Sequence, residues 1–278
     1  MPTQVGTSTA WTALSSGQAH SCAIRSDTTL WCWGLNTYGQ LGLGSTTQQN
    51  SPVQVTTPAT GGWAQVSAGN GSTCAIRTDG SLYCWGNDAS GQLGDGGTTE
   101  QNSPVPVTTP AAGGWTSVSV GSSFACGLRT SALYCWGVNS NGQLGIGTTT
   151  GATTPTAVAG TWSSVSAGTF HTCAIATAAT LWCWGNGGNG RLGTGNTTTI
   201  KSPAQVGTAN DWHTVSAATT FTCGTRAGPT TWCWGQNNLG QLGLSDLTDR
   251  TTPQLLPLSG RPVEAGSESN GTSLIQPQ

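Results

Sequence analysis

A pair of cysteines recurs five times in this chain, with a period of about fifty residues. The second cysteine of each pair is followed directly by Trp-Gly, and the pairs use all ten cysteines of the sequence. A long period with near-constant internal spacing indicates an array of one supersecondary unit, so the repeat determines the architecture. The five pairs are Cys22 and Cys32, Cys74 and Cys84, Cys126 and Cys135, Cys173 and Cys183, and Cys223 and Cys233.

Three further motifs recur in step with the cysteines. A tryptophan stands three residues before a segment of the Val-Ser-Ala-Gly type, a Gly-Gln-Leu-Gly segment follows each Trp-Gly, and a proline-led extended segment ends each repeat. Together they define complete repeats at residues 11–55, 63–107, 115–158, 162–206 and 212–256. An incomplete sixth repeat covers residues 262–278 and is joined by a proline-led strand at residues 2–5.

Each repeat is expected to form three or four short strands. Residues 74–77 and 82–85 are brief and rich in β-branched or aromatic side chains, and residues 78–81 between them form a hairpin turn signal. No segment keeps a helical period of 3.6 residues, so we expect no long helix. Short strands, glycine-rich turns and one aromatic motif per unit predict one blade of a β-propeller per repeat.

The chain ends suggest how the propeller closes. The strand at residues 2–5 has no upstream partner, and the segments at residues 263–266 and 273–275 have no Cys-Trp-Gly strand after them. Pairing these strands would cover two open edges that otherwise favour aggregation. We therefore predict a single all-β propeller over residues 1–278, with five complete blades and a partial sixth closed by N- and C-terminal strands. The alternative is a piece cut from a longer propeller.

Two segments carry a resemblance to a known family. Residues 165–175 read VSAGTFHTCAI and residues 32–42 read CWGLNTYGQLG. They resemble the repeat of the regulator of chromosome condensation family, over roughly residues 2–266. The resemblance implies a β-propeller in which strands from both chain ends complete one blade. That family usually has seven blades, and this chain departs from it because it is too short for seven at its own period. The chain resembles a secreted, cysteine-rich variant of bacterial type.

Hairpin register predicts disulfides between the paired cysteines. A three-residue loop at residues 78–80 places Cys74 opposite Cys84, and a loop one residue shorter in the third repeat keeps Cys126 opposite Cys135. Opposed residues have Cβ atoms about 4.5–5.5 Å apart, close to disulfide distance. We predict five bridges, one for each pair, and zinc coordination and buried free thiols are the alternatives.

Five disulfides would indicate an oxidising compartment, so we expect an extracellular or cell-surface location. No export signal is visible at the start of the chain. Charged residues make up 6% of the sequence and the net charge is −2, so the chain has no basic surface for nucleic acid. No apolar run approaches the ~18 residues of a membrane span, so we expect no membrane insertion.

Few residues suggest a site. His20 and His171 occupy a repeat position that is filled elsewhere by serine or phenylalanine, which indicates a packing role. The acids, such as Asp95 with Glu100 and Asp246 with Asp249, are too sparse for calcium. We expect no catalytic residues, no metal and no cofactor. The candidate binding residues are Arg191, which replaces glutamine in the Gly-Gln-Leu-Gly motif, and the tryptophans that begin each repeat near loops, Trp11, Trp63, Trp115, Trp162 and Trp212.

These observations favour a non-catalytic binding or scaffold module that acts through protein–protein contacts or self-assembly. A lectin-like propeller that binds glycans through loop tryptophans is the alternative. The resemblance adds a third reading, guanine nucleotide exchange on a small GTPase, which the low charge, the predicted disulfides and the short propeller disfavour.

Overall fold

The computed structural model describes residues 10–111, 113–228 and 230–257, together with residues 261–263 and 273–275. These residues form strands, turns and one 3-10 turn, η1 (Gly188–Gly190). Within the described part of the chain, no helix has the length and apolar character needed to cross a bilayer.

Each complete repeat forms one antiparallel sheet of four consecutive strands, which we call a blade. Blade 1 contains β1 (Trp11–Ser16), β2 (His20–Arg25), β3 (Leu30–Gly34) and β4 (Gln49–Gln54). Blade 2 contains β5 (Trp63–Ala68), β6 (Ser72–Arg77), β7 (Leu82–Gly86) and β8 (Gln101–Pro106). Blade 3 contains β9 (Trp115–Val120), β10 (Phe124–Arg129), β11 (Ala132–Gly137) and β12 (Ala152–Val158).

Blade 4 contains β13 (Trp162–Ala167), β14 (His171–Ala176), β15 (Leu181–Gly185) and β16 (Ile200–Gln205). Blade 5 contains β17 (Trp212–Ala217), β18 (Phe221–Arg226), β19 (Thr230–Gly235) and β20 (Arg250–Leu255). A separate two-stranded sheet pairs β21 (Arg261–Val263) with β22 (Ser273–Ile275).

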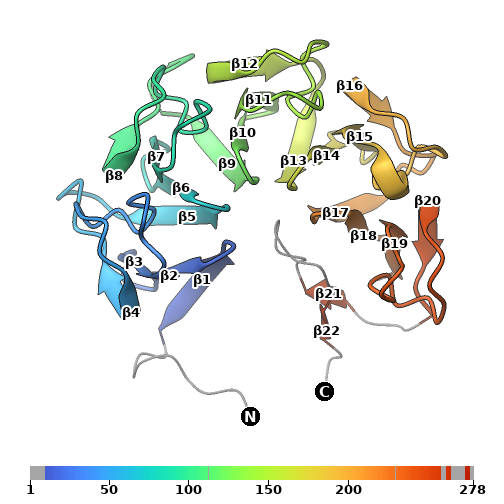
Figure 1. Ribbon diagram of the computed structural model, residues 1–278, viewed down its shortest axis with the longest axis horizontal. Helices are drawn as coiled ribbons and strands as arrows, with labels where there is room; N and C mark the ends of the chain where they lie inside the picture. The colour runs from blue at the N-terminus through green and yellow to red at the C-terminus, as the bar shows by residue number, and fades with distance from the viewer. Residues whose placement is uncertain (1–9, 112, 229, 258–260, 264–272, 276–278) are drawn as a thin grey trace.

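The five blades follow one another around an arc (Figure 1). The first strand of each blade lies toward the centre and the fourth lies at the periphery (Figure 1). The small β21–β22 sheet lies between blade 5 and blade 1. Of the predicted sixth blade, only these two strands fall within the described residues, because the expected strand at residues 2–5 lies outside them.

The predicted cysteine register is confirmed in every blade. Cys74 is the direct partner of Cys84, and Cys126 that of Cys135, so the shorter third repeat loses its residue in the turn. All five cysteine pairs form disulfides, with Cα atoms 4.1 Å apart. None of the ten cysteines is free. Each bridge therefore joins the second and third strands of a single blade.

The cores lie between blades. Each of the first four blades turns its disulfide toward the next blade, which inserts two tryptophans. The interface between blades 1 and 2, for example, contains Cys22 and Cys32 with Trp63 and Trp85. The inner strands are also joined, because a serine hydroxyl of one blade accepts a hydrogen bond from a backbone N–H of the next, as Ser15 does from Ala68 at 2.9 Å. A blade is thus incomplete until its neighbour packs against it.

Candidate functional site

The second tryptophan of each inserted pair is anchored by a backbone carbonyl. Trp85 Nε1 donates to the Gln40 carbonyl at 2.9 Å, and Trp136 Nε1 donates to the Gln92 carbonyl at the same distance. Trp184 and Trp234 do the same with the carbonyls of Gln143 and Arg191. All four of these indoles are fully buried. The Gly-Gln-Leu-Gly motif of one blade is therefore a receptor for the tryptophan of the next.

The first tryptophan of each pair was a predicted ligand candidate. Trp63, Trp115, Trp162 and Trp212 are only 2–4% exposed, whereas Trp11 is half-buried. Trp63 packs edge-on against Trp85 with ring centroids 6.0 Å apart, and the Arg77 guanidinium lies 5.5 Å from its ring. Four of the five candidates thus have their ring faces occupied by the protein itself, and Trp11 at the start of the arc is the accessible one.

Arg191, the other candidate, lies between blades and is 6% exposed. Its Nη1 donates to the Thr219 carbonyl of blade 5 at 2.9 Å, and its Nε donates to the Gly188 carbonyl at 2.9 Å. Burial lowers the pKa of Arg191. A glutamine at this position accepts a backbone N–H through its side-chain oxygen, as Gln40 does from Tyr38. Arginine cannot accept a hydrogen bond, and this segment instead forms η1.

The two repeat-matched histidines are buried at blade interfaces. His20 Nε2 lies 2.8 Å from Thr73 Oγ1 of the next blade, and His171 Nε2 lies 2.8 Å from Thr222 Oγ1. Burial lowers the pKa of His20 to about 4 and that of His171 to about 3, and the nearby Arg191 lowers the latter further. Both side chains pack between blades, in agreement with the packing role expected from the sequence.

A buried asparagine organises the loop after the third strand. Asn36 Oδ1 accepts the Leu41 N–H at 2.9 Å, and its Nδ2 donates to the carbonyls of Ser45 and Thr47 at 2.8 and 3.0 Å. Asn139 and Asn237 act in the same way in their repeats. The loop that carries the receptor motif is therefore held by one amide.

Blade 2 has an aspartate at this position. Asp88 is fully buried, and its Oδ1 accepts the Leu93 N–H at 2.9 Å. Its Oδ2 has no hydrogen-bond partner within the described residues, since a carboxylate cannot donate to carbonyls as the asparagine amide does. Burial raises the pKa of Asp88 to about 6, and the neighbouring Asp95 contributes in the same direction. The sequence placed this residue in a turn without indicating its burial.

The two acids of the fifth repeat that were weighed for calcium are engaged in local contacts. Asp246 pairs with Arg250 at 2.6 Å and also accepts from Asn237 Nδ2, while Asp249 accepts from the Asn237 backbone N–H at 2.7 Å. Among the described residues, no group of three or more histidine, cysteine, aspartate or glutamate side chains could hold a metal ion.

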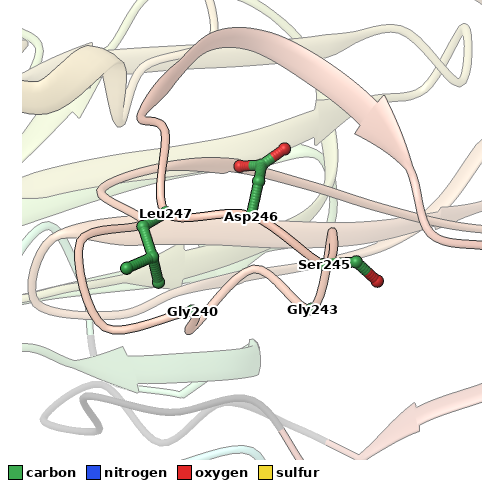
Figure 2. Close-up of a pocket in the computed structure, with 5 residues that line it drawn as sticks. All are labelled: Gly240, Gly243, Ser245, Asp246 and Leu247. Carbon is green, nitrogen blue, oxygen red and sulfur yellow. The ribbon is translucent and has the colours of Figure 1, made fainter.

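The loop between β19 and β20 of blade 5 carries a pocket of about 410 Å³. Figure 2 shows its lining residues, which are Gly240, Gly243, Ser245, Asp246 and Leu247. Leu247 is 66% exposed and the nearby Leu239 is 78% exposed. This site was not predicted from the sequence. A signal was present, because Leu247 replaces a threonine found in the other four repeats, at Thr46, Thr98, Thr149 and Thr197.

Comparison with models of known protein families identifies the same repeat along the chain. A model of the regulator of chromosome condensation (RCC1) repeat matches residues 27–76, 79–128, 131–175, 179–224 and 230–267. A second model of the same repeat matches residues 11–40, 63–92, 115–143 and 162–191.

Curated relatives share the repeat over part of their length. The Ultraviolet-B receptor UVR8 of Arabidopsis thaliana is 40% identical over 91 residues, which is 33% of this chain and 21% of UVR8. The E3 ubiquitin-protein ligase HERC2 of Homo sapiens is 30% identical over 147 residues, which is 52% of this chain and 3% of HERC2. The chain thus matches only a small part of either relative.

Solved structures share the fold. Human WBSCR16 superposes with a TM-score of 0.82 at 21% identity, over 91% of this chain and 69% of that chain. Yeast RCC1 (Prp20), solved bound to Kap60, gives 0.59 at 15% identity over 90% of this chain and 75% of that one. The ectodomain of the receptor kinase CR4 of Physcomitrella patens gives 0.51 at 21% identity, over 81% and 50%. At these identities the likeness concerns the fold alone.

Proposed function

We propose that this chain, which belongs to the regulator of chromosome condensation (RCC1) repeat family, is a non-catalytic scaffold that binds a protein partner. The observation that carries the proposal is the pocket on blade 5, which the exposed Leu247 lines, together with Leu239, which is also exposed and precedes the lining residue Gly240 in the sequence. Exposed apolar side chains grouped on a rigid frame favour protein contact. Yeast RCC1, a propeller of the same fold, is solved in complex with the protein Kap60.

The proposed location is extracellular or at a cell surface. Five disulfides support it, because such bridges persist in oxidising compartments. A receptor-kinase ectodomain also shares this fold. Protein recovered from its natural source should have an intact mass about ten daltons below the fully reduced value, one hydrogen lost for each cysteine. A mass that matches ten free thiols would remove the argument for this location.

We further propose that the β21–β22 sheet and the strand at residues 2–5 form a thin sixth blade. The approach of β21 to β18 and β19 supports this arrangement. An incomplete blade would offer an edge through which copies of the chain could assemble.

Glycan binding is the less supported alternative, because four of its five candidate tryptophans are buried, and three of these four also have an arginine against the ring. Nucleotide exchange on a GTPase has no further support in the site geometry. Both alternatives are open to direct assay, by glycan-array binding and by measurement of GDP release.

Capture of extracellular proteins on the immobilised chain tests the scaffold function. We expect a captured protein that is lost with Leu239→Ser and Leu247→Ser combined. Leu14→Ser is the matched control, since Leu14 is 62% exposed at the other end of the arc. Identical capture by wild type and the double variant, or accelerated GDP release with no captured protein, would reject this assignment.

A further inference from the structure

The outer loop of blade 2, residues 87–100, has the same length and the same anchors as its counterpart in blade 1, residues 35–48. Both loops end where the strand after them pairs with the glycine of Trp-Gly. Gly96 also donates its N–H to the Thr153 carbonyl of the next blade at 3.0 Å, and the equivalent glycine of blade 1 makes the same contact with blade 2. The backbone of the loop therefore follows the same path in both blades.

One side chain fills the inside of this loop. In blade 1, Asn36 Oδ1 accepts a leucine N–H, and Asn36 Nδ2 donates to the carbonyls nine and eleven residues further on. In blade 2, Asp88 Oδ1 accepts the equivalent N–H, that of Leu93, at the same distance of 2.9 Å. By this equivalence Asp88 Oδ2 takes the place of the amide nitrogen and faces the carbonyls of Gly97 and Thr99.

The second oxygen of Asp88 lacks any compensating group within the described residues. Asp88 is fully buried, its Oδ2 has no hydrogen-bond partner, and neither salt bridge of the described chain includes it. Burial raises the pKa of Asp88 to about 6, and Asp95 raises it further, so the carboxyl is ionised at neutral pH. A buried anion that faces only carbonyl oxygens needs a positive charge to be stable.

The second carboxylate of the loop is also specific to blade 2. Asp95 is exposed, and the equivalent residues of the other blades are Leu43, Ile146, Thr194 and Leu244. The three apolar ones pack against the cores between blades. Blade 2 thus replaces an amide and a core-packing side chain by two acids within one loop. Because Asp95 is close enough to affect the pKa of Asp88, both acids act on the same site.

We propose that this loop binds a calcium ion between the Asp88 carboxylate and the carbonyls of Gly97 and Thr99. Asp95 and water complete the coordination. Calcium takes about six to eight oxygen ligands, including carboxylates and backbone carbonyls, whereas magnesium requires a near-octahedral site and keeps more of its water. Two acidic side chains suffice here, because carbonyls supply the other protein ligands. In the sequence Asp95 and Glu100 alone are too sparse, and the buried Asp88 supplies the missing ligand.

An ion at this position would also hold blades 2 and 3 together. The same loop carries the Gln92 carbonyl that accepts from Trp136, and its Gly96 donates to Thr153. Calcium should therefore slow the hydrogen exchange of the amides of residues 93–99. The site is independent of the protein-binding function proposed above. Calcium sites of extracellular modules have dissociation constants on the order of 10⁻⁴–10⁻³ M, and we expect this range.

Calorimetric titration of calcium chloride into the chelator-treated whole chain at about pH 7.5 tests the site. We expect one ion per chain and a thermal midpoint that rises with the calcium concentration. Asp88→Asn should abolish both effects. Without calcium this variant should be at least as stable as wild type, because Asn36 and Asn139 support the same loop in blades 1 and 3. Its loss of binding would therefore not reflect a failure to fold.

Asp79→Asn is the matched control, since Asp79 is an exposed turn residue of the same blade and the change in charge is identical. This variant should bind calcium like wild type. Asp95→Leu introduces the residue found in blades 1 and 5, and it should weaken binding by at least about tenfold.

Four outcomes would overturn the calcium site. They are absence of calcium binding by wild type, equal binding by Asp88→Asn, an equal rise of the midpoint with magnesium chloride, and an equal rise with sodium chloride at matched ionic strength. The last result would indicate general screening of charge rather than a bound ion. A calcium response that leaves the exchange of residues 93–99 unchanged would place the ion elsewhere and would also reject the proposal.

Discussion

His20 and His171 show how one buried polar contact is used between blades. Thr73 Oγ1 donates its single hydrogen to the Gln40 carbonyl at 2.8 Å, so it must accept from His20. The imidazole therefore carries its proton on Nε2 and leaves Nδ1 as a buried lone pair, without a partner among the described residues. Protonation of that atom would bury a charge with nothing to balance it.

Acid should destabilise the protein through these histidines. Their folded pKa values of about 4 and about 3 lie below the unfolded value of 6.5, so the unfolded state binds the proton first. The free energy of unfolding should be unaffected above pH 6.5 and should fall as pH drops below it, by roughly 2 kcal/mol per histidine at pH 5. Denaturant unfolding between pH 8 and pH 4 measures this loss.

Phenylalanine provides the test variant, since Phe124 occupies the equivalent repeat position in blade 3 and is fully buried there. The double variant His20→Phe and His171→Phe should flatten the acid dependence. His213→Gln is the control, because His213 is exposed and its loss should leave the profile unchanged. An acid dependence that persists in the double variant would assign it to other groups.

Asp88 should have the opposite pH dependence. Its folded pKa of about 6 lies above the ordinary 3.8, so its burial costs stability as pH rises from about 4 to 6. Asp88→Asn should restore donation to the loop carbonyls and stabilise the protein by about 1–3 kcal/mol at pH 8. The gain should shrink as pH falls below 6, while the exposed control Asp79→Asn should show neither effect. A gain that is independent of pH would contradict the ionisation argument.

At the scale of the element, the receptor carbonyl usually accepts two hydrogen bonds. Gln143 accepts from Trp184 and from Thr172, and Arg191 accepts from Trp234 and Thr222. Blade 3 has Ala125 at the threonine position, so Gln92 accepts from Trp136 alone among the described residues. The interface between blades 2 and 3 is therefore the one in which this contact is incomplete.

Ala125→Thr should repair that interface. The added hydroxyl should reach the Gln92 carbonyl as Thr172 reaches that of Gln143, and it should raise the free energy of unfolding by about 1 kcal/mol. Ala125→Val is the matched control, because it adds the same bulk without a donor. If valine stabilises as much as threonine, packing explains the gain and the hydrogen-bond argument fails.

The disulfides should stabilise each blade separately. Each closes a loop of nine or ten residues, which corresponds to about 2.5–3 kcal/mol in the chain-entropy model. Cys126→Ala with Cys135→Ala should therefore lower the denaturant midpoint while leaving the other four bridges oxidised. A double variant with an unchanged midpoint would show that packing alone holds this hairpin.

The sequence predicted those features that are local within one repeat. The turn at residues 78–80 and the facing cysteines depend on spacing, and the structure agrees with both. The receptor was missed because it forms between blades, from residues about forty-five positions apart such as Gln40 and Trp85. The burial of Asp88 was missed for a related reason, since its surroundings come from the loop that folds back onto it.

At the scale of the whole molecule, the first and the fifth blade differ from the three blades between them. Blade 1 carries Trp11 and Trp33, which are half-buried, whereas the core around the disulfide of blade 5 contains no tryptophan among the described residues. The equivalents of Leu14 in the later blades are partly or fully buried, whereas Leu14 itself is 62% exposed. The contacts between blades are thus distributed unequally along the chain. The first blade has only one complete neighbour within the described residues.

This asymmetry predicts unequal costs for the same substitution. Trp136→Ala should cost about 3–5 kcal/mol, because the indole is fully buried and bonded to Gln92. Trp33→Ala should cost well under half of that, since the ring is half-buried and no preceding blade receives it among the described residues. Paired denaturant titrations of the two variants measure the difference. Equal costs would mean that the face of blade 1 is covered as completely as an internal interface, which would place a full blade beside it.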